Sequence, residues 1–125
     1  MIYGIGVDMV EIERMKDSHM KDYVIARLFH PLEIAGIPLQ EQRKKEYLAS
    51  RFAAKEAFVK ALHVGFREIT PKDIGIQNDD LGKPSFVYTD KVAMLLPPNF
   101  SRVHVTISHE KNNAIAFVVI EVSGE

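Results

Sequence analysis

The hydrophobic and polar positions of this chain change period several times, and each period predicts a different element. In residues 1–10, β-branched and aromatic residues alternate with glycines and one carboxylate, which is the period-2 pattern of a strand. One face of this strand carries Gly4, Gly6 and Asp8, so it is almost bare before it ends in an acid. The bare face leaves room for another backbone or for a ligand.

The next segments have the spacing of helices. Residues 11–29 carry apolar side chains at roughly 3.6-residue intervals and predict one or two short helices. Residues 40–62 lack glycine and proline and are rich in Ala, Glu, Lys, Arg and Leu, so they predict one long helix. Pro31 and residues 36–38 separate these two helical regions.

The second half of the chain predicts two strand hairpins with a short helix between them. The segments are 73–78 and 83–88 for the first hairpin, 89–96 for the helix, and 103–108 and 114–122 for the second hairpin. The last strand is apolar on both faces, which predicts a central strand or a strand in a subunit interface.

Length and composition limit the classes of function. With 125 residues, 46% of them hydrophobic, the chain matches a single globular domain over 1–125. A formal net charge of −1 supplies no overall positive field for nucleic acid or an anionic membrane, so neither is an expected partner. The absence of cysteine excludes a disulfide framework and thiol chemistry, which leaves oxygen ligands for a metal. No apolar stretch is as long as a membrane span and no signal-peptide pattern is found, so we expect a cytoplasmic location.

Asp8, Glu56 and Lys60 are candidate site residues. Residues 51–62 place charges among small and apolar side chains, where a charge costs free energy unless a partner or ion compensates it. Glu56 and Lys60 are four apart and share a helix face, which is also typical of an exposed ion pair, and Asp8 alone is also typical of a helix cap. Together the three match a Mg²⁺ site that completes its ligands with substrate phosphates. A lysine beside the metal would neutralise further phosphate charge, so the predicted substrate is a diphosphate.

Other polar residues carry weaker signals. His109 ends the strand 103–108, where a histidine is commonly a hydrogen-bonded rim residue and is also a candidate for chemistry. Basic residues are frequent before and along the long helix, although solvated helix faces have the same composition. They are Arg14, Lys16, Lys21, Arg27, Arg43, Lys44, Lys45 and Arg51.

Four motifs occur in order over nearly the whole chain. They are Gly4-Ile5-Gly6-Val7-Asp8 with Glu11-Ile12-Glu13-Arg14, Arg51-Phe52-Ala53-Ala54-Lys55-Glu56-Ala57 with Lys60-Ala61, Gly82-Lys83-Pro84, and Ser108-His109. On these motifs the chain resembles the holo-acyl-carrier-protein synthases, the small bacterial 4′-phosphopantetheinyl transferases. The resemblance implies an α+β domain with an antiparallel sheet packed on one long helix and short helices, assembled as a homotrimer with sites between subunits.

The resemblance also implies an activity. Members transfer the phosphopantetheine arm of coenzyme A to a serine of apo-acyl carrier protein, with Mg²⁺, in fatty acid biosynthesis, and release adenosine 3′,5′-bisphosphate. It implies that Asp8 and Glu56 are the metal ligands and that Lys60 contacts the reacting phosphate. The proton acceptor stays open among Glu56, Asp8 acting through a metal-bound water, and His109.

Further roles follow from the same resemblance. Arg43 and Arg51 are implied to contact the nucleotide end of coenzyme A, with Pro84 and His109 coming from the adjoining subunit. The implied docking residues for the acidic helix of the carrier protein are Arg14, Lys21 and Arg27.

The chain departs from the family pattern at two places. Many relatives carry Gly-Thr-Gly after the long helix, where this chain has His63-Val64-Gly65, so only Gly65 remains for a backbone contact to the ligand. Glu110 follows His109, and its charge would favour a protonated histidine if the two side chains meet.

Two other classes of function are compatible with parts of the sequence. A non-catalytic module binding coenzyme A or carrier protein would not need both Asp8 and Glu56. An unrelated Mg²⁺-dependent nucleotide hydrolase is the third class, but no Gly-x-x-x-x-Gly-Lys-Ser/Thr loop supports it.

Overall fold

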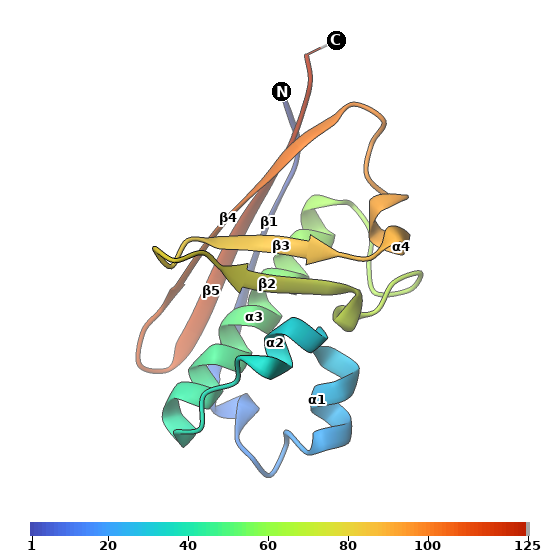
Figure 1. Ribbon diagram of the computed structural model, residues 1–125. Coiled ribbons are helices and arrows are strands. Elements are labelled where there is room, and N and C mark those ends of the chain that lie inside the picture. Colours follow the sequence, from blue (N-terminus) through green and yellow to red (C-terminus); the bar gives the residue numbers. More distant parts are fainter. Residues whose placement is uncertain (125) are drawn as a thin grey trace.

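The computed structural model describes residues 1–124, in which one long helix lies between a three-stranded sheet and a separate hairpin (Figure 1). In chain order the elements are β1 (Ile2–Glu11), the 3₁₀ helix η1 (Ile12–Met15), α1 (Asp22–Leu28), α2 (Pro31–Ala35), α3 (Glu41–Ala61), the 3₁₀ helix η2 (Pro71–Asp73), β2 (Ile74–Asn78), β3 (Pro84–Tyr88), α4 (Asp90–Ala93), β4 (Phe100–His109) and β5 (Asn113–Val122). The elements share one hydrophobic core, so the described residues form a single α+β domain.

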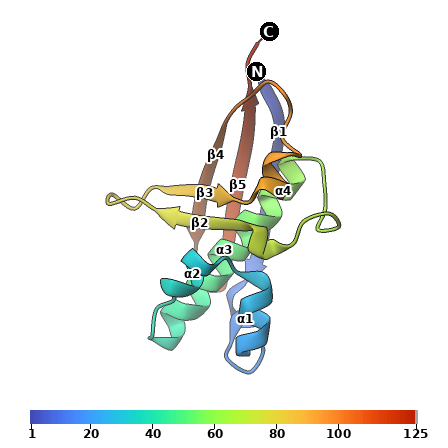
Figure 2. The same ribbon diagram turned by 45° about the vertical axis from the view of Figure 1, so that its right-hand side comes forward.

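The strands form two antiparallel sheets rather than one. The larger has the order β1-β5-β4, and the smaller is the hairpin of β2 and β3. The hairpin crosses in front of α3 and β3 lies near β4, but the two sheets share no strand pairing (Figures 1 and 2). The last strand was predicted to be central or to lie in a subunit interface, and β5 is central, since it pairs with both β1 and β4.

Strand β1 lies directly against α3 because its inward face lacks side chains at two positions. A Cβ atom on Gly6 would lie 2.0 Å from the carbonyl oxygen of Ala57, and one on Gly4 would lie 1.9 Å from that of Ala61. The predicted bare face is therefore filled by a second backbone. Asp8 is the next inward-facing residue, so the same contact carries its carboxylate to the helix.

Two short helices differ from the prediction. Pro31 does not only separate helices: it stands in the first turn of α2, where its missing N–H is not needed. The preceding His30 caps this helix, with Nδ1 accepting a 3.0 Å hydrogen bond from the backbone N–H of Leu32. Helix α4 ends at Ala93, earlier than predicted.

The face of the larger sheet that points away from α3 is apolar and exposed. Ile5, Val7 and Met9 of β1 are 56%, 48% and 59% exposed, and Ile115 and Phe117 of β5 lie on the same face. No helix of the described residues has the length and apolar content that crossing a bilayer requires. The apolar sheet face is an unusual exposure for a chain of this composition.

Candidate active site

Asp8 meets two residues of α3 at the end of the glycine contact. Lys60 Nζ lies 3.2 Å from Asp8 Oδ1 and donates a 3.0 Å hydrogen bond to the carbonyl oxygen of Val7. Glu56, one turn earlier, is half-buried and near enough to Asp8 for the two carboxylates to affect each other. In the sequence, Asp8 is 48 positions before Glu56, whereas Glu56 and Lys60 share one helix face. The structure brings all three residues together.

The charge of this cluster is unbalanced. Burial raises the pKa of Glu56, the negative charge of Asp8 raises it further, and Lys60 opposes both. Two ionised carboxylates beside one ammonium leave a net negative charge in a partly desolvated place. The side chains of Asp8 and Lys60 are 20% and 53% exposed, so a ligand has access to them.

Asp8 and Glu56 fit a magnesium ion that takes other ligands from outside the chain. Within residues 1–124, no three or more His, Cys, Asp or Glu side chains are arranged to hold a metal by themselves. Mg²⁺ is commonly held by only one or two carboxylates, together with waters and substrate phosphates. A cation between the two carboxylates would also remove the repulsion that raises the pKa of Glu56.

A pocket of about 370 Å³ lies between α3, the β2–β3 hairpin and β4. Arg43 and Arg51 of α3 line it, together with Pro84 of β3 and His109 of β4. Neither arginine has an acidic partner within 4.0 Å among residues 1–124. Glu46 also lines the pocket, so its two guanidinium charges exceed one carboxylate charge and favour an anionic ligand.

The pocket and the Asp8 cluster lie at opposite edges of the larger sheet. Asp8 is on β1, whereas His109 is on β4, and β5 lies between these strands. On α3, Arg51 and Glu56 are five residues apart, about 140° around the helix axis, so they leave from different faces. A single protomer does not join the two groups of residues.

Within one chain, Pro84 and His109 line the same pocket as Arg43 and Arg51. The reason is that the β2–β3 hairpin folds over α3 of its own chain and lies near β4 (Figure 2). Gly65 is apart from both groups, in a hollow beyond the end of α3.

The two departures from the family pattern have local structural roles. His63 has a left-handed φ of 65° just after α3, and its Nε2 lies 3.2 Å from the carbonyl oxygen of Tyr3. The carboxylate of Glu110 accepts 3.0 Å hydrogen bonds from the backbone of Asn112 and the side chain of Asn113. Glu110 therefore stabilises the turn between β4 and β5.

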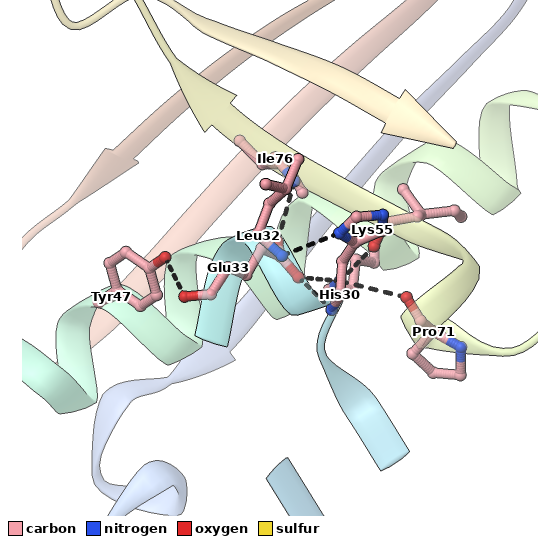
Figure 3. Close-up of polar contacts among 8 residues, drawn as sticks. His30, Leu32, Glu33, Tyr47, Lys55, Pro71 and Ile76 are labelled. Carbon is pink, nitrogen blue, oxygen red and sulfur yellow. Dashed lines mark hydrogen bonds and ion pairs between the residues drawn. The ribbon is translucent and has the colours of Figure 1, made fainter. Parts of the chain in front are cut away.

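Lys55 is a charged residue of the central motif to which the sequence assigned no role. It is fully buried, and its Nζ donates to Glu33 Oε1 and to the carbonyl oxygens of Pro71 (3.1 Å) and Ile74 (Figure 3). The carboxylate of Glu33 also accepts from the backbone N–H groups of His30 and Ile76, at 2.9 and 3.0 Å. The alanines around Lys55 indicated that it needs a partner, but nothing local indicated Glu33.

The basic residues divide into those with internal partners and those without. Lys44 pairs with Asp17 at 3.1 Å and Lys45 with Glu13 at 2.7 Å, which ties α3 to the segment after β1. The predicted docking residues belong to the second group. Arg14 is on η1, Lys21 is the N-cap residue of α1, and Arg27 is in the last turn of α1. All three are exposed, and none forms an ion pair within residues 1–124.

The chain belongs to the 4′-phosphopantetheinyl transferase superfamily, whose model matches residues 4–118. A holo-[acyl-carrier-protein] synthase of Clostridium acetobutylicum is 44% identical, over 98% of this chain and 99% of the relative. One of Pelagibacter ubique is 42% identical, over 96% and 97%.

Solved structures of the same class share the fold. The holo-[acyl-carrier-protein] synthase of Neisseria meningitidis superposes with a TM-score of 0.86 at 39% identity, covering 97% of this chain and 99% of that one. A holo-(acyl-carrier-protein) synthase of Bacillus anthracis in complex with CoA (3′,5′-ADP) has a TM-score of 0.81 at 38% identity, covering 98% and 99%.

Proposed function

We propose that this protein is a holo-acyl-carrier-protein synthase, which transfers the 4′-phosphopantetheine arm of coenzyme A to a serine of apo-acyl carrier protein. The observation that carries the proposal is the cluster of Asp8, Glu56 and Lys60, held together by β1 and α3 in a chain of this superfamily. The reaction releases adenosine 3′,5′-bisphosphate and serves fatty acid biosynthesis in the cytoplasm. Residues 1–125 act as one transferase domain.

Mg²⁺ is the proposed cofactor, held by Asp8 and Glu56, and when bound it supplies positive charge to the diphosphate. Lys60 neutralises further charge on the reacting phosphate, because its ammonium is half-exposed and only loosely paired at 3.2 Å. The serine hydroxyl must lose a proton as its oxygen attacks phosphorus in line with the leaving phosphate. Glu56 is one candidate to accept that proton, beside Asp8 acting through a water and His109.

The nucleotide end of coenzyme A binds in the pocket with Arg43 and Arg51, lined also by Pro84 and His109. Because this pocket and the Asp8 cluster lie at opposite sheet edges, we propose that a complete site combines the cluster of one protomer with the pocket of a neighbour. The exposed apolar sheet face supports the association, as a homotrimer. Gly65 is proposed to contact coenzyme A from the separate hollow beyond the end of α3.

Mixing two inactive variants tests the composite site. Asp8→Ala and Arg51→Ala proteins are each expected to be inactive, but their mixed oligomers contain sites with both halves intact, about one quarter of all sites in a random mixture. Activity regained on co-expression supports the proposal. A mixture as inactive as its parents, with mixed oligomers demonstrated by mass, would show that the site is built within one chain.

Arg14, Lys21 and Arg27 are proposed to dock the acidic helix of the carrier protein. The three exposed cations have no acidic partner among residues 1–124, which suits them to an anionic surface.

The first experiment is the intact mass of apo-acyl carrier protein after incubation with this protein, coenzyme A and Mg²⁺. We expect a gain of one phosphopantetheine group, which a chelator and the Asp8→Ala substitution both prevent. No gain, with coenzyme A still bound, would favour a non-catalytic binding module instead. Phosphate release without carrier protein would favour a hydrolase.

A further inference from the structure

The guanidinium group of Arg51 is held by an aromatic ring rather than by an acid. Its Cζ atom lies 3.9 Å from the centroid of the Tyr47 ring, one helical turn earlier on α3. Its Nε atom is buried and has no hydrogen-bond partner among the described residues. Stacking therefore restrains the plane of the group while its charge and several donors remain available to a ligand in the pocket.

Tyr47 is in turn fixed at its other end. Its hydroxyl donates a 2.5 Å hydrogen bond to the backbone carbonyl oxygen of Glu33, as Figure 3 shows. Burial raises the pKa of Tyr47, which keeps the phenol protonated and able to donate. Both ends of this side chain are thus engaged, at the ring by Arg51 and at the hydroxyl by α2.

Glu33 is a rigid anchor for that hydrogen bond. Its side chain is fully buried in the ion pair with Lys55, and the backbone N–H of Ile76 also binds it. The same ammonium of Lys55 binds carbonyl groups of Pro71 and Ile74, which lead into the hairpin that forms a wall of the pocket. A chain of direct contacts therefore runs from the buried ion pair through Tyr47 to Arg51.

We propose that Tyr47 is a positioning residue, which holds the guanidinium of Arg51 in the orientation that binds a phosphate of the nucleotide end of coenzyme A. The inference rests on the proposed function, because it takes the pocket to be the nucleotide site. The hydroxyl anchor keeps the ring in place, and the ring keeps Arg51 in place. Tyr47 thus acts on the ligand through Arg51.

Binding of adenosine 3′,5′-bisphosphate to the purified protein, measured by calorimetry, tests this proposal. Tyr47→Leu removes the stacking partner and is expected to weaken binding about 3- to 30-fold, the range of a cation–π contact. Tyr47→Phe keeps the ring and loses only the anchor, so a smaller loss of about 2- to 5-fold is expected. In transfer assays both should raise the KM for coenzyme A and leave the KM for carrier protein unchanged.

The double variant separates positioning from direct contact. If Tyr47 acts through Arg51, Tyr47→Leu weakens binding no further in an Arg51→Ala background. An equal loss in both backgrounds would overturn the proposal, since Tyr47 would then act on the ligand independently. Tyr23→Leu is the matched control, because Arg27 lies 5.9 Å from the Tyr23 ring on α1, outside the pocket, and nucleotide binding should not change.

Arg51→Lys provides a test that does not alter Tyr47. Lysine keeps the charge but has no plane to stack, so its binding should be as weak as that of Tyr47→Leu. Wild-type affinity in Arg51→Lys would also overturn the proposal. If Arg51→Ala itself binds the nucleotide normally, the nucleotide site of the proposed function is wrong, which is a different failure from that of Tyr47.

Discussion

Helix α3 carries two lysines of the same short motif, Lys55 and Lys60, which are five residues apart but have opposite environments. Lys55 is fully buried, and its ammonium has three acceptors, which are one carboxylate and two backbone carbonyls. Lys60 is half-exposed, with one carbonyl and one carboxylate near it at 3.0 and 3.2 Å. The first ammonium is saturated by its own chain, and the second has capacity left for a ligand.

The contrast teaches that a charged residue of a motif is a candidate for ligand binding only if its own chain leaves some of its hydrogen-bond donors or acceptors without partners. Burial lowers the pKa of Lys55, and the neighbouring Glu33 opposes that effect, which is the balance of a structural ion pair. Asp8, which pairs with Lys60, also lies near the carboxylate of Glu56. This cluster therefore has more negative than positive charge, as a cation-binding site does.

The largest expected effect comes from Lys55→Met. Removing the ammonium leaves the carboxylate of Glu33 buried without its counter-charge, which typically costs about 3–5 kcal/mol. The free energy of unfolding in urea measures the loss, with Lys60→Met as the matched control. A Lys55→Met protein as stable as the wild type would end the distinction between the two lysines.

Lys60→Met is expected to have the reverse profile. Its partly exposed side chain should contribute less than about 0.5 kcal/mol to stability. Removing a cation from the reacting phosphate should lower kcat about 100- to 1,000-fold. Single-turnover transfer to carrier protein measures this, and an unchanged kcat would contradict the assignment of Lys60.

The comparison extends to the surface through Arg14 and Lys45. Lys45 is paired with Glu13 at 2.7 Å, whereas Arg14 has no acidic partner in the described part of the chain. We expect Arg14→Ala to raise the KM for carrier protein roughly five-fold, equivalent to about 1 kcal/mol. Lys45→Ala is the control and should leave this KM close to that of the wild type. Equal changes in both would mean that general positive charge, not a defined docking residue, attracts the partner.

The smallest effect expected is a gain of stability in Glu56→Gln. Burial and Asp8 raise the pKa of Glu56, so the folded protein holds this proton more tightly than the unfolded chain does. Stability therefore falls as the pH rises from the ordinary carboxyl pKa of about 4.3 through the raised pKa of the folded state, above which the full penalty is present, and there is no penalty in acid below that ordinary value. Thermal unfolding should show a higher Tm for Glu56→Gln near neutral pH and no difference in acid. A lower Tm at neutral pH would mean that the carboxylate stabilises the fold.

Two elements were predictable from local features of the sequence: the long helix from a run of helix-forming residues without glycine or proline, and β1 from its alternating residues. The bare face of β1 correctly indicated the close approach of another backbone. Helix α2 is not predicted by its local sequence, because Pro31 is typical of a break between helices as well as of a first turn.

The candidate site was only partly predictable, because long-range contacts decide its grouping. The partner of Lys55 is Glu33, which lies 22 residues away in a segment whose hydrophobic residues follow no regular spacing. The five-residue spacing of Arg51 and Glu56 already implied different helix faces. The shared pocket of Arg43, Arg51, Pro84 and His109 within one chain was not predictable, because it depends on how the β2–β3 hairpin folds over α3.

The contact of Gly4 and Gly6 with α3 also constrains how this sequence can change over time. A methyl group at either position would lie about 2 Å from a carbonyl oxygen, so the strand would have to move outward. That strand carries Asp8, and its other face carries the exposed apolar residues of the sheet. Substitution of either glycine would therefore alter the packing on α3, the position of Asp8 and the exposed apolar face in one step, so these three features have to be inherited together.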